Sequence, residues 1–171
     1  MFDTDDKLST NAILQKLPVF AGLYPEEYAH IRNICIPARF PENHVIFAEG
    51  EGSPCMYVLL AGEIELSTRK QGRIYTLKPG EIFGEIGLLA QKKRTATATT
   101  RSPAALLQIN SDAFRLLLGR EPRISYAIMH NITLNLSEHI IRMNKSDILE
   151  YIPPQQGDAV NLGPQQFKRQ G

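Results

Sequence analysis

The sequence of 171 residues has few cysteines, no long apolar run and no excess of charge of either sign. Its two cysteines, Cys35 and Cys55, are too few for a disulfide framework. The longest apolar run, Met56–Ala61, is far shorter than the roughly 20 residues that a helix needs to cross a bilayer. Lys and Arg number 19 and Asp and Glu 18, which argues against a generic polyanion binder but leaves room for a local basic pocket.

The N-terminus begins Met-Phe-Asp-Thr-Asp-Asp, which is acidic where a secretory signal would be basic and then apolar. We therefore expect a cytoplasmic protein that does not associate with a membrane. Hydrophobic residues make up 43% of the chain and charged residues 22%, so the composition supports a real core. The length corresponds to about one domain.

Common catalytic and metal-binding patterns are also missing. The sequence has no Gly-x-Ser-x-Gly, no P-loop and no His-Glu-x-x-His. It has no His-x-His pair of the kind that metal-dependent β-roll enzymes resembling cupins use, and its four histidines are scattered. We therefore expect no enzymatic activity, no metal site and no cofactor.

The segment from about residue 34 to 110 has the pattern of a β-rich domain. Short runs rich in Val, Ile, Leu, Thr or Tyr alternate there with glycine- and proline-containing turns. The predicted strands are His44–Ala48, Met56–Leu60, Glu63–Ser67, Arg73–Leu77, Ala96–Thr100 and Ala104–Asn110. Strands of about five residues at close spacing predict a mainly β fold, an antiparallel sandwich or barrel.

Helical patterns flank this β-roll. A helix is predicted from Ser9 to Pro18, a second near Pro25, and a third capped by Asn110 or Ser111 and closed by Gly119. A long C-terminal helix starts around Pro122 and carries apolar residues about four apart, namely Ile124, Ile128, Ile132, Leu136, Ile140 and Met143.

These patterns predict three regions. Residues 9–148 form one domain, with the β-roll at 34–110 and the C-terminal helices at 111–148. Residues 1–8 are a flexible start, and residues 149–171 are a flexible tail rich in Gln, Pro and Gly.

One stretch, Pro79–Ala98, interrupts the strand pattern with a run that contains Gly84, Glu85, Gly87 and Arg94. Gly84 and Gly87 permit close approach of a ligand to the backbone. One helical turn over Glu85–Leu89 would present free N–H groups to an anion, and Arg94 would clasp that anion. A carboxylate beside an anion clamp suits a ligand that has a hydroxyl next to a phosphate. Alone, Glu85 and Arg94 would equally fit a structural ion pair.

The run Phe-Gly-Glu-Ile-Gly-Leu-Leu, followed after four residues by Arg-Thr-Ala, resembles the phosphate-binding cassette of the cyclic-nucleotide-binding domain family. That family includes the catabolite activator protein, regulatory subunits of cyclic-nucleotide-dependent kinases and cyclic-nucleotide-gated channels. The resemblance covers roughly Leu17–Met143 and includes Gly50-Glu51 and Tyr57–Ile64. It implies a jelly roll (double-stranded β-helix) flanked by N-terminal helices and a long C-terminal helix.

The resemblance also implies roles for individual residues. Glu85 would accept from the ribose 2′-hydroxyl, and Arg94 would pair with the cyclic phosphate. Thr95 would bond the phosphate, or the amino group of a syn guanine. A base contact from the C-terminal helix would come from Asn135 or His139, beneath Leu136 or Ile140 as an apolar lid. The implied ligand-binding residues are Phe83, Gly84, Glu85, Ile86, Gly87, Leu88, Arg94, Thr95, Ala96, Asn135 and His139.

The implied ligand is cyclic AMP or cyclic GMP, and the sequence does not choose between them. Lys92-Lys93 replaces the neutral residue and proline of many relatives, which leaves a cyclic dinucleotide open as a third ligand. A stand-alone sensor would move its C-terminal helix on ligand binding and signal to a partner protein.

Two further expectations follow from the long helix and what succeeds it. Its distal half would pair with a second copy in a homodimer. About 25 residues remain after Met143, too few for a helix-turn-helix, so direct DNA binding is not expected. The alternatives are a ligand-independent interaction or dimerisation module, and the sensor fragment of a larger transcription regulator or channel.

Overall fold

The computed structural model describes residues 10–148, with side chains described through residue 142. The predicted flexible segments 1–8 and 149–171 lie outside these residues. Residues 10–14 are helical. The further elements are η1 (Pro18–Phe20), α2 (Tyr28–Ile34), β1 (Cys35–Phe40), β2 (Val45–Phe47), β3 (Cys55–Ala61), β4 (Ile64–Thr68), β5 (Gly72–Leu77), β6 (Ile82–Phe83), α3 (Glu85–Leu89), β7 (Thr97–Thr100), β8 (Ala104–Asn110), α4 (Ser111–Arg120) and α5 (Pro122–Ile148).

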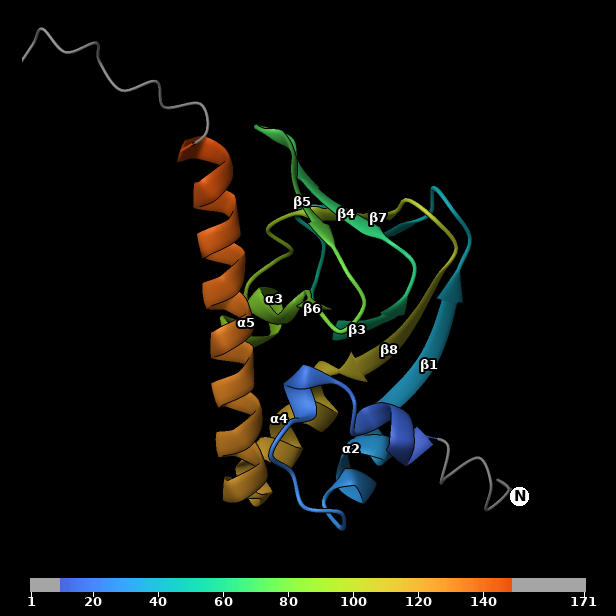
Figure 1. Ribbon diagram of the computed structural model, residues 1–171, viewed down its shortest axis with the longest axis vertical. Helices are drawn as coiled ribbons and strands as arrows, with labels where there is room; N and C mark the ends of the chain where they lie inside the picture. Colours follow the sequence, from blue (N-terminus) through green and yellow to red (C-terminus); the bar gives the residue numbers. More distant parts are fainter. Residues whose placement is uncertain (1–9, 149–171) are drawn as a thin grey trace, which may run out of the picture.

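The strands form two antiparallel sheets of four strands each, in the orders β1-β8-β3-β6 and β2-β7-β4-β5. The sheets face each other as a roll, and the helices gather below it and along one side (Figure 1). This arrangement confirms the predicted antiparallel jelly roll with flanking helices. Among the residues described, no helix combines the length and apolar character needed to cross a bilayer.

Two apolar clusters hold the fold together. One lies between the two sheets and includes Leu59, Ile64, Leu77 and Leu106, all fully buried. The other joins the outer face of the first sheet to the helices, and Phe114 is fully buried within it. Strand β3 contributes to both clusters because alternate side chains of a strand point to opposite faces. This explains why the β3 sequence is apolar throughout.

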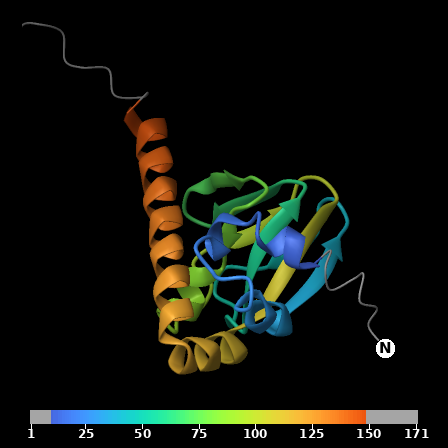
Figure 2. The same cartoon turned by 60° about the horizontal axis from the view of Figure 1, so that its bottom comes forward.

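Helix α5 is the longest element and is packed along only part of its length. Ile124, Ile128 and Ile132 are buried against the N-terminal helices and α4, whereas Leu136 is half-buried and Ile140 is 59% exposed. The first half is therefore fixed by apolar packing, at about 1.5–3 kcal/mol per buried side chain. The second half runs upward beside the roll (Figures 1 and 2).

The structure corrects several local predictions. It adds two strands, the edge strand β1 and the two-residue β6, which lies inside the stretch predicted to be non-strand. Helix α2 begins at Tyr28 rather than near Pro25, which lies in the preceding turn. Gly119 does not close the third helix, because α4 continues to Arg120 and ends just before Pro122. The predicted cap at Asn110 is confirmed, since its side chain accepts from the N–H groups of Asp112 and Ala113.

Candidate nucleotide-binding site

A cavity of about 300 Å³ opens between the roll, α3 and the second half of α5. Its floor comes from β4, β5 and β6, one wall from residues 83–87 and 94–96, and its roof from α5. The volume lies at the lower end of the range for small-molecule sites. The lining is mainly apolar, with Glu85, Arg94 and His139 as its ionisable side chains besides Tyr75.

The wall of this cavity depends on Gly84, the residue that precedes α3. Its φ of +77° lies in the left-handed region, which disfavours residues with a Cβ. A Cβ at this position would also clash with Nη1 of Arg94. Glycine at position 84 therefore allows both the turn into the predicted helical turn Glu85–Leu89 and the placement of the arginine.

The Arg94 side chain is buried, with only 4% of the residue exposed. Its guanidinium donates to the carbonyl oxygens of Gly84 (2.9 Å) and Cys55 (2.6 Å) and lies 3.9 Å above the Phe47 ring. Burial lowers the pKa of Arg94, but a guanidinium keeps its charge in proteins. Two of its five N–H groups make these bonds, and Nε is buried with no partner among the residues described.

Phe47, Tyr57 and Phe83 form an aromatic base for this arginine. The ring centroids of Tyr57 and Phe83 are 5.1 Å apart, and those of Phe47 and Phe83 are 5.9 Å apart. The guanidinium therefore has a fixed orientation and retains donors for an anion.

Glu85 is the first residue of α3 and is 3% exposed. Burial raises the pKa of its carboxyl, against the lowering effects of its own backbone N–H and of His139 and Arg94. Its Oε2 is buried and accepts from no group within the described part of the chain. It makes no ion pair with Arg94, so the structural ion pair that the sequence left open is not formed. A buried acceptor without a donor costs about 1–3 kcal/mol unless a ligand supplies one.

The roof of the cavity is formed by Leu136, His139 and Ile140 of α5. The His139 ring packs on the Tyr75 ring, with centroids 4.6 Å apart at an angle of 47°. Nε2 of His139 is buried and, among residues 10–142, makes no hydrogen bond. The helix thus brings an apolar cover and one unsatisfied polar atom to the cavity.

The structure brings nine of the eleven residues implied by the resemblance to this cavity. They are Phe83, Gly84, Glu85, Ile86, Gly87, Arg94, Thr95, Ala96 and His139. Leu88 does not line it, because the opposite face of α3 packs into the helix-side core, where Leu88 is 2% exposed. Asn135 does not line it either, because its side of α5 faces a second cavity beside η1.

Sequence reasoning missed five lining residues, namely Phe47, Leu66, Ile74, Tyr75 and Ile82. Each lies in a strand, and an inward aromatic or apolar side chain there has the same pattern as a core residue. Lys92 and Lys93, which had suggested a more highly charged ligand, lie beside a separate hollow together with Arg115 rather than in this cavity.

Comparison with known proteins gives the family. Residues 37–121 match the family model of the cyclic nucleotide-binding domain. The chain is 27% identical over 128 residues to the CRP-like cAMP-activated global transcriptional regulator of Mycobacterium tuberculosis, covering 72% of this chain and 57% of that protein. It is 30% identical over 109 residues to the cAMP-dependent protein kinase regulatory subunit of Aspergillus niger, covering 63% and 26%.

A solved cyclic nucleotide-binding domain from Methylobacillus flagellatus has the same fold, with a TM-score of 0.73 and 17% identity over 88% of this chain and 87% of that one. The match of residues 37–121 to the family model places the chain in the cyclic nucleotide-binding domain family. It spans 57% or less of the length of the two curated relatives above. Both are named as regulators.

Proposed function

We propose that the chain is a non-catalytic cytoplasmic receptor for a cyclic mononucleotide, bound in the cavity beneath α5. One observation carries this proposal. Glu85 and Arg94 line the same cavity, and each has a buried polar atom that lacks a partner among the described residues. A ligand with a hydroxyl donor next to an anionic phosphate would satisfy both atoms.

The roles of the two residues follow from their chemistry. Arg94 would donate to the cyclic phosphate through Nε and its remaining N–H groups, while the Gly84 and Cys55 carbonyls hold the guanidinium in place. Glu85 would accept from the ribose 2′-hydroxyl. Backbone N–H groups at Gly87, Thr95 and Ala96 would complete the phosphate site, as the family resemblance implies.

The base would lie between the roll and α5. Leu136 and Ile140 offer an apolar cover, and His139 offers Nε2 as a hydrogen-bonding group. The cavity of about 300 Å³ favours a mononucleotide over a cyclic dinucleotide, which has about twice the volume. Cyclic AMP is our first candidate because both curated relatives are named for it, with cyclic GMP second.

Ligand binding would draw the second half of α5 onto the base, and a partner protein would respond to the new position of this helix. The energy for the movement is limited to the ligand's differential affinity for the two helix positions. A ligand-independent interaction module would lack this response.

Isothermal titration of nucleotide-free protein with cyclic AMP and cyclic GMP tests the proposal. Wild type should bind one nucleotide per chain. Arg94→Lys should weaken binding at least about tenfold, because a point charge replaces the planar fork without removing the charge. Arg101→Ala is the matched control, since Arg101 pairs with Glu65 on the far side of β4 and lines no part of the cavity. Binding by neither nucleotide, or equal binding by Arg94→Lys, would contradict the proposal.

A further inference from the structure

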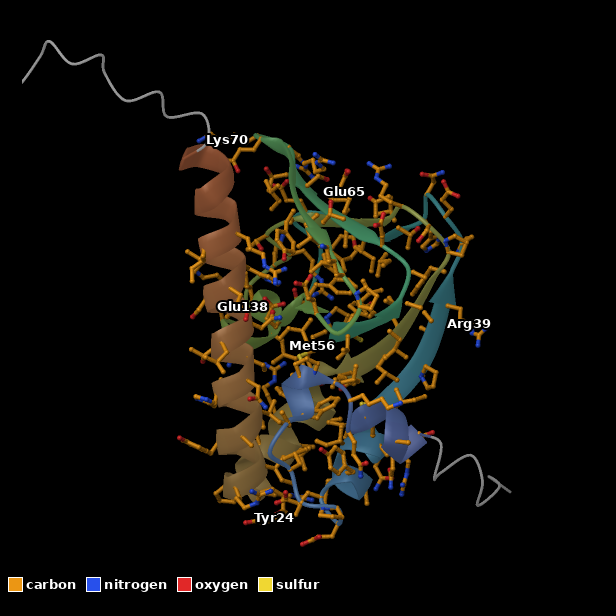
Figure 3. The ribbon with its side chains drawn as sticks, in the orientation of Figure 1. Tyr24, Arg39, Met56, Glu65, Lys70 and Glu138 are labelled. Carbon is orange, nitrogen blue, oxygen red and sulfur yellow. The ribbon has the colours of Figure 1, made fainter. Side chains whose placement is uncertain are left out.

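A polar cluster joins the second half of α5 to the turn between β5 and β6. The Glu81 carboxylate accepts from Tyr75 Oη (3.0 Å), from the Lys78 backbone N–H (2.8 Å) and from Arg142 Nη1 (2.7 Å). Arg142 also donates to Tyr75 Oη (2.8 Å) and, along its own helix, to Glu138 (3.2 Å). Glu138 lies on the flank of α5 that is turned toward the roll (Figure 3).

These contacts lie where apolar packing of α5 has become sparse. Ile140 and Ile141 are 59% and 53% exposed, whereas the isoleucines of the first half of the helix are buried. The Glu81 side chain is only 12% exposed, whereas that of Arg142 is 47% exposed, so the carboxylate is shielded from water and the guanidinium is half-exposed. The polar cluster is therefore a main attachment of the helix beside the cavity.

Glu81 also orders two side chains of the cavity itself. Tyr75 donates to it directly, and His139 Nε2 lies 3.8 Å from its Oε1, too far for a hydrogen bond. Burial pushes the pKa of the Glu81 carboxyl upward, yet the proximity of His139, the Lys78 N–H and Tyr75 hold it at about 2. The carboxylate is thus ionised throughout the neutral range.

We propose that Glu81 is a positioning residue whose bonds to Arg142 and Tyr75 hold α5 closed over the cavity and set the rate at which ligand leaves. The bonds between Glu81, Tyr75 and Arg142 are made by this chain's own residues, whereas the effect on ligand exit rests on the proposed function. The carboxylate itself does not line the ligand cavity. It acts through α5, Tyr75 and His139.

The first test needs no ligand. In nucleotide-free Glu81→Gln, amide hydrogen exchange of residues 134–142 should accelerate by about 10- to 100-fold, the effect of losing charge-assisted hydrogen bonds. Residues 124–132 should be unchanged because apolar packing holds them. Glu65→Gln is the control, because it removes a carboxylate that also binds an arginine, Arg101, but contacts no part of α5. Unchanged exchange at 134–142, or acceleration throughout the chain, would overturn the proposal.

The second test measures ligand exit. A fluorescent cyclic AMP analogue should dissociate from Glu81→Gln about 10- to 100-fold faster than from wild type, with a much smaller change in the association rate. The combination Glu81→Gln with Arg142→Gln should have less than the sum of the two single effects, since both changes weaken the shared Glu81–Arg142 contact. Additive effects would show that the two residues act separately. If wild type binds no nucleotide, the proposed function fails, while the exchange test still decides whether Glu81 closes the helix.

Discussion

At the residue scale, Glu85 and Arg94 indicate a site whose buried polar groups favour ligand binding and lower the stability of the fold. Glu85 holds a carboxylate in a cavity wall without a donor for Oε2 among the described residues, and burial raises its pKa. A residue kept for stability alone would have a partner there. The cost of burial would be offset when a ligand hydroxyl arrives.

Glu85→Gln should therefore stabilise the ligand-free protein while weakening nucleotide binding. Removal of the buried charge is expected to contribute about 1–2 kcal/mol, which corresponds to a rise of about 2–8 °C in Tm for a chain of this size. Thermal unfolding at neutral pH measures the gain, and titration with cyclic AMP measures the loss.

The pH dependence provides the control for this variant. Because the pKa of Glu85 is raised in the folded state, ionisation destabilises the fold only above the carboxyl pKa of the unfolded chain. The difference between wild type and Glu85→Gln should shrink toward pH 4, where both states hold the proton. A stability gain that is the same at pH 4 and pH 7 would mean that the charge is not its source.

The pKa of Glu81 is shifted in the opposite direction from that of Glu85. Its pKa is lowered to about 2, so it contributes stability above the unfolded carboxyl pKa, near 4.5, and loses it as the pH falls toward 2. The facing groups are Tyr75 on β5, the Lys78 backbone N–H, and His139 and Arg142 on α5. Wild type should lose more stability than Glu81→Gln between pH 4.5 and 2.5 in denaturant unfolding. Parallel pH profiles would contradict this.

At the scale of elements, the short helix α3 depends on the left-handed residue that precedes it. Gly84→Ala should weaken cyclic AMP binding strongly, because the new Cβ displaces the Arg94 guanidinium in addition to straining the backbone. The strain alone costs about 1–2 kcal/mol. Titration of the variant gives the loss of affinity, and thermal unfolding gives the loss of stability.

Gly22→Ala separates the two effects. Gly22 has a nearly identical φ of +81°, but a Cβ there meets nothing within 4 Å. The two variants should lose similar stability from strain, and only Gly84→Ala should lose affinity. Equal affinity in both would mean that Gly84 does not position Arg94.

Elements with a strong local sequence pattern could be predicted, and elements that depend on long-range contacts could not. The cassette was predictable because two glycines, a carboxylate and an arginine occur there at fixed spacing, and the turn over Glu85–Leu89 formed as expected. Strand β1 was missed because Pro37 and the exposed Ile36 break the alternating pattern, and its pairing with β8 is a long-range contact. The Glu81 cluster joins residues 61 positions apart, and no local pattern reports such a contact.

Placement within an element was harder to predict than its existence. Leu88 belongs to the cassette sequence, but helical geometry turns it into the core while Glu85 and Gly87 face the cavity wall. Asn135 and His139 are one helical turn apart, yet only His139 reaches the cavity. Which side of α5 faces the roll is decided by its packing with α4 and with η1, and η1 lies far from these residues in sequence.

At the scale of the whole molecule, α5 leaves apolar side chains uncovered. Tyr126, Leu134 and Ile141 are 76%, 53% and 53% exposed, and the last two are seven residues apart, so they share one side of the helix. We predict a homodimer through this side, detectable by sedimentation equilibrium at micromolar concentrations. The double variant Leu134→Lys with Ile141→Lys should be monomeric.

An exposed apolar residue elsewhere supplies the comparison. Ile36 is 59% exposed and belongs to β1, a strand that lies on the opposite side of the molecule from α5 (Figure 1). Ile36→Lys should leave the oligomeric state, measured by sedimentation equilibrium, unchanged. A monomeric wild type, or a dimer that survives the double variant, would show that this side of α5 is not the interface.

The central claim is that a cyclic nucleotide binds between α3, the roll and α5. The most direct measurement is titration of ¹⁵N-labelled, nucleotide-free protein with cyclic AMP, followed by amide chemical shifts. The account predicts saturating shifts at the amides of Gly84, Gly87 and Ala96 and at the Arg94 side-chain N–H. No shifts at millimolar nucleotide, or saturating shifts confined to the second cavity around Asn131 and Leu134, would contradict it.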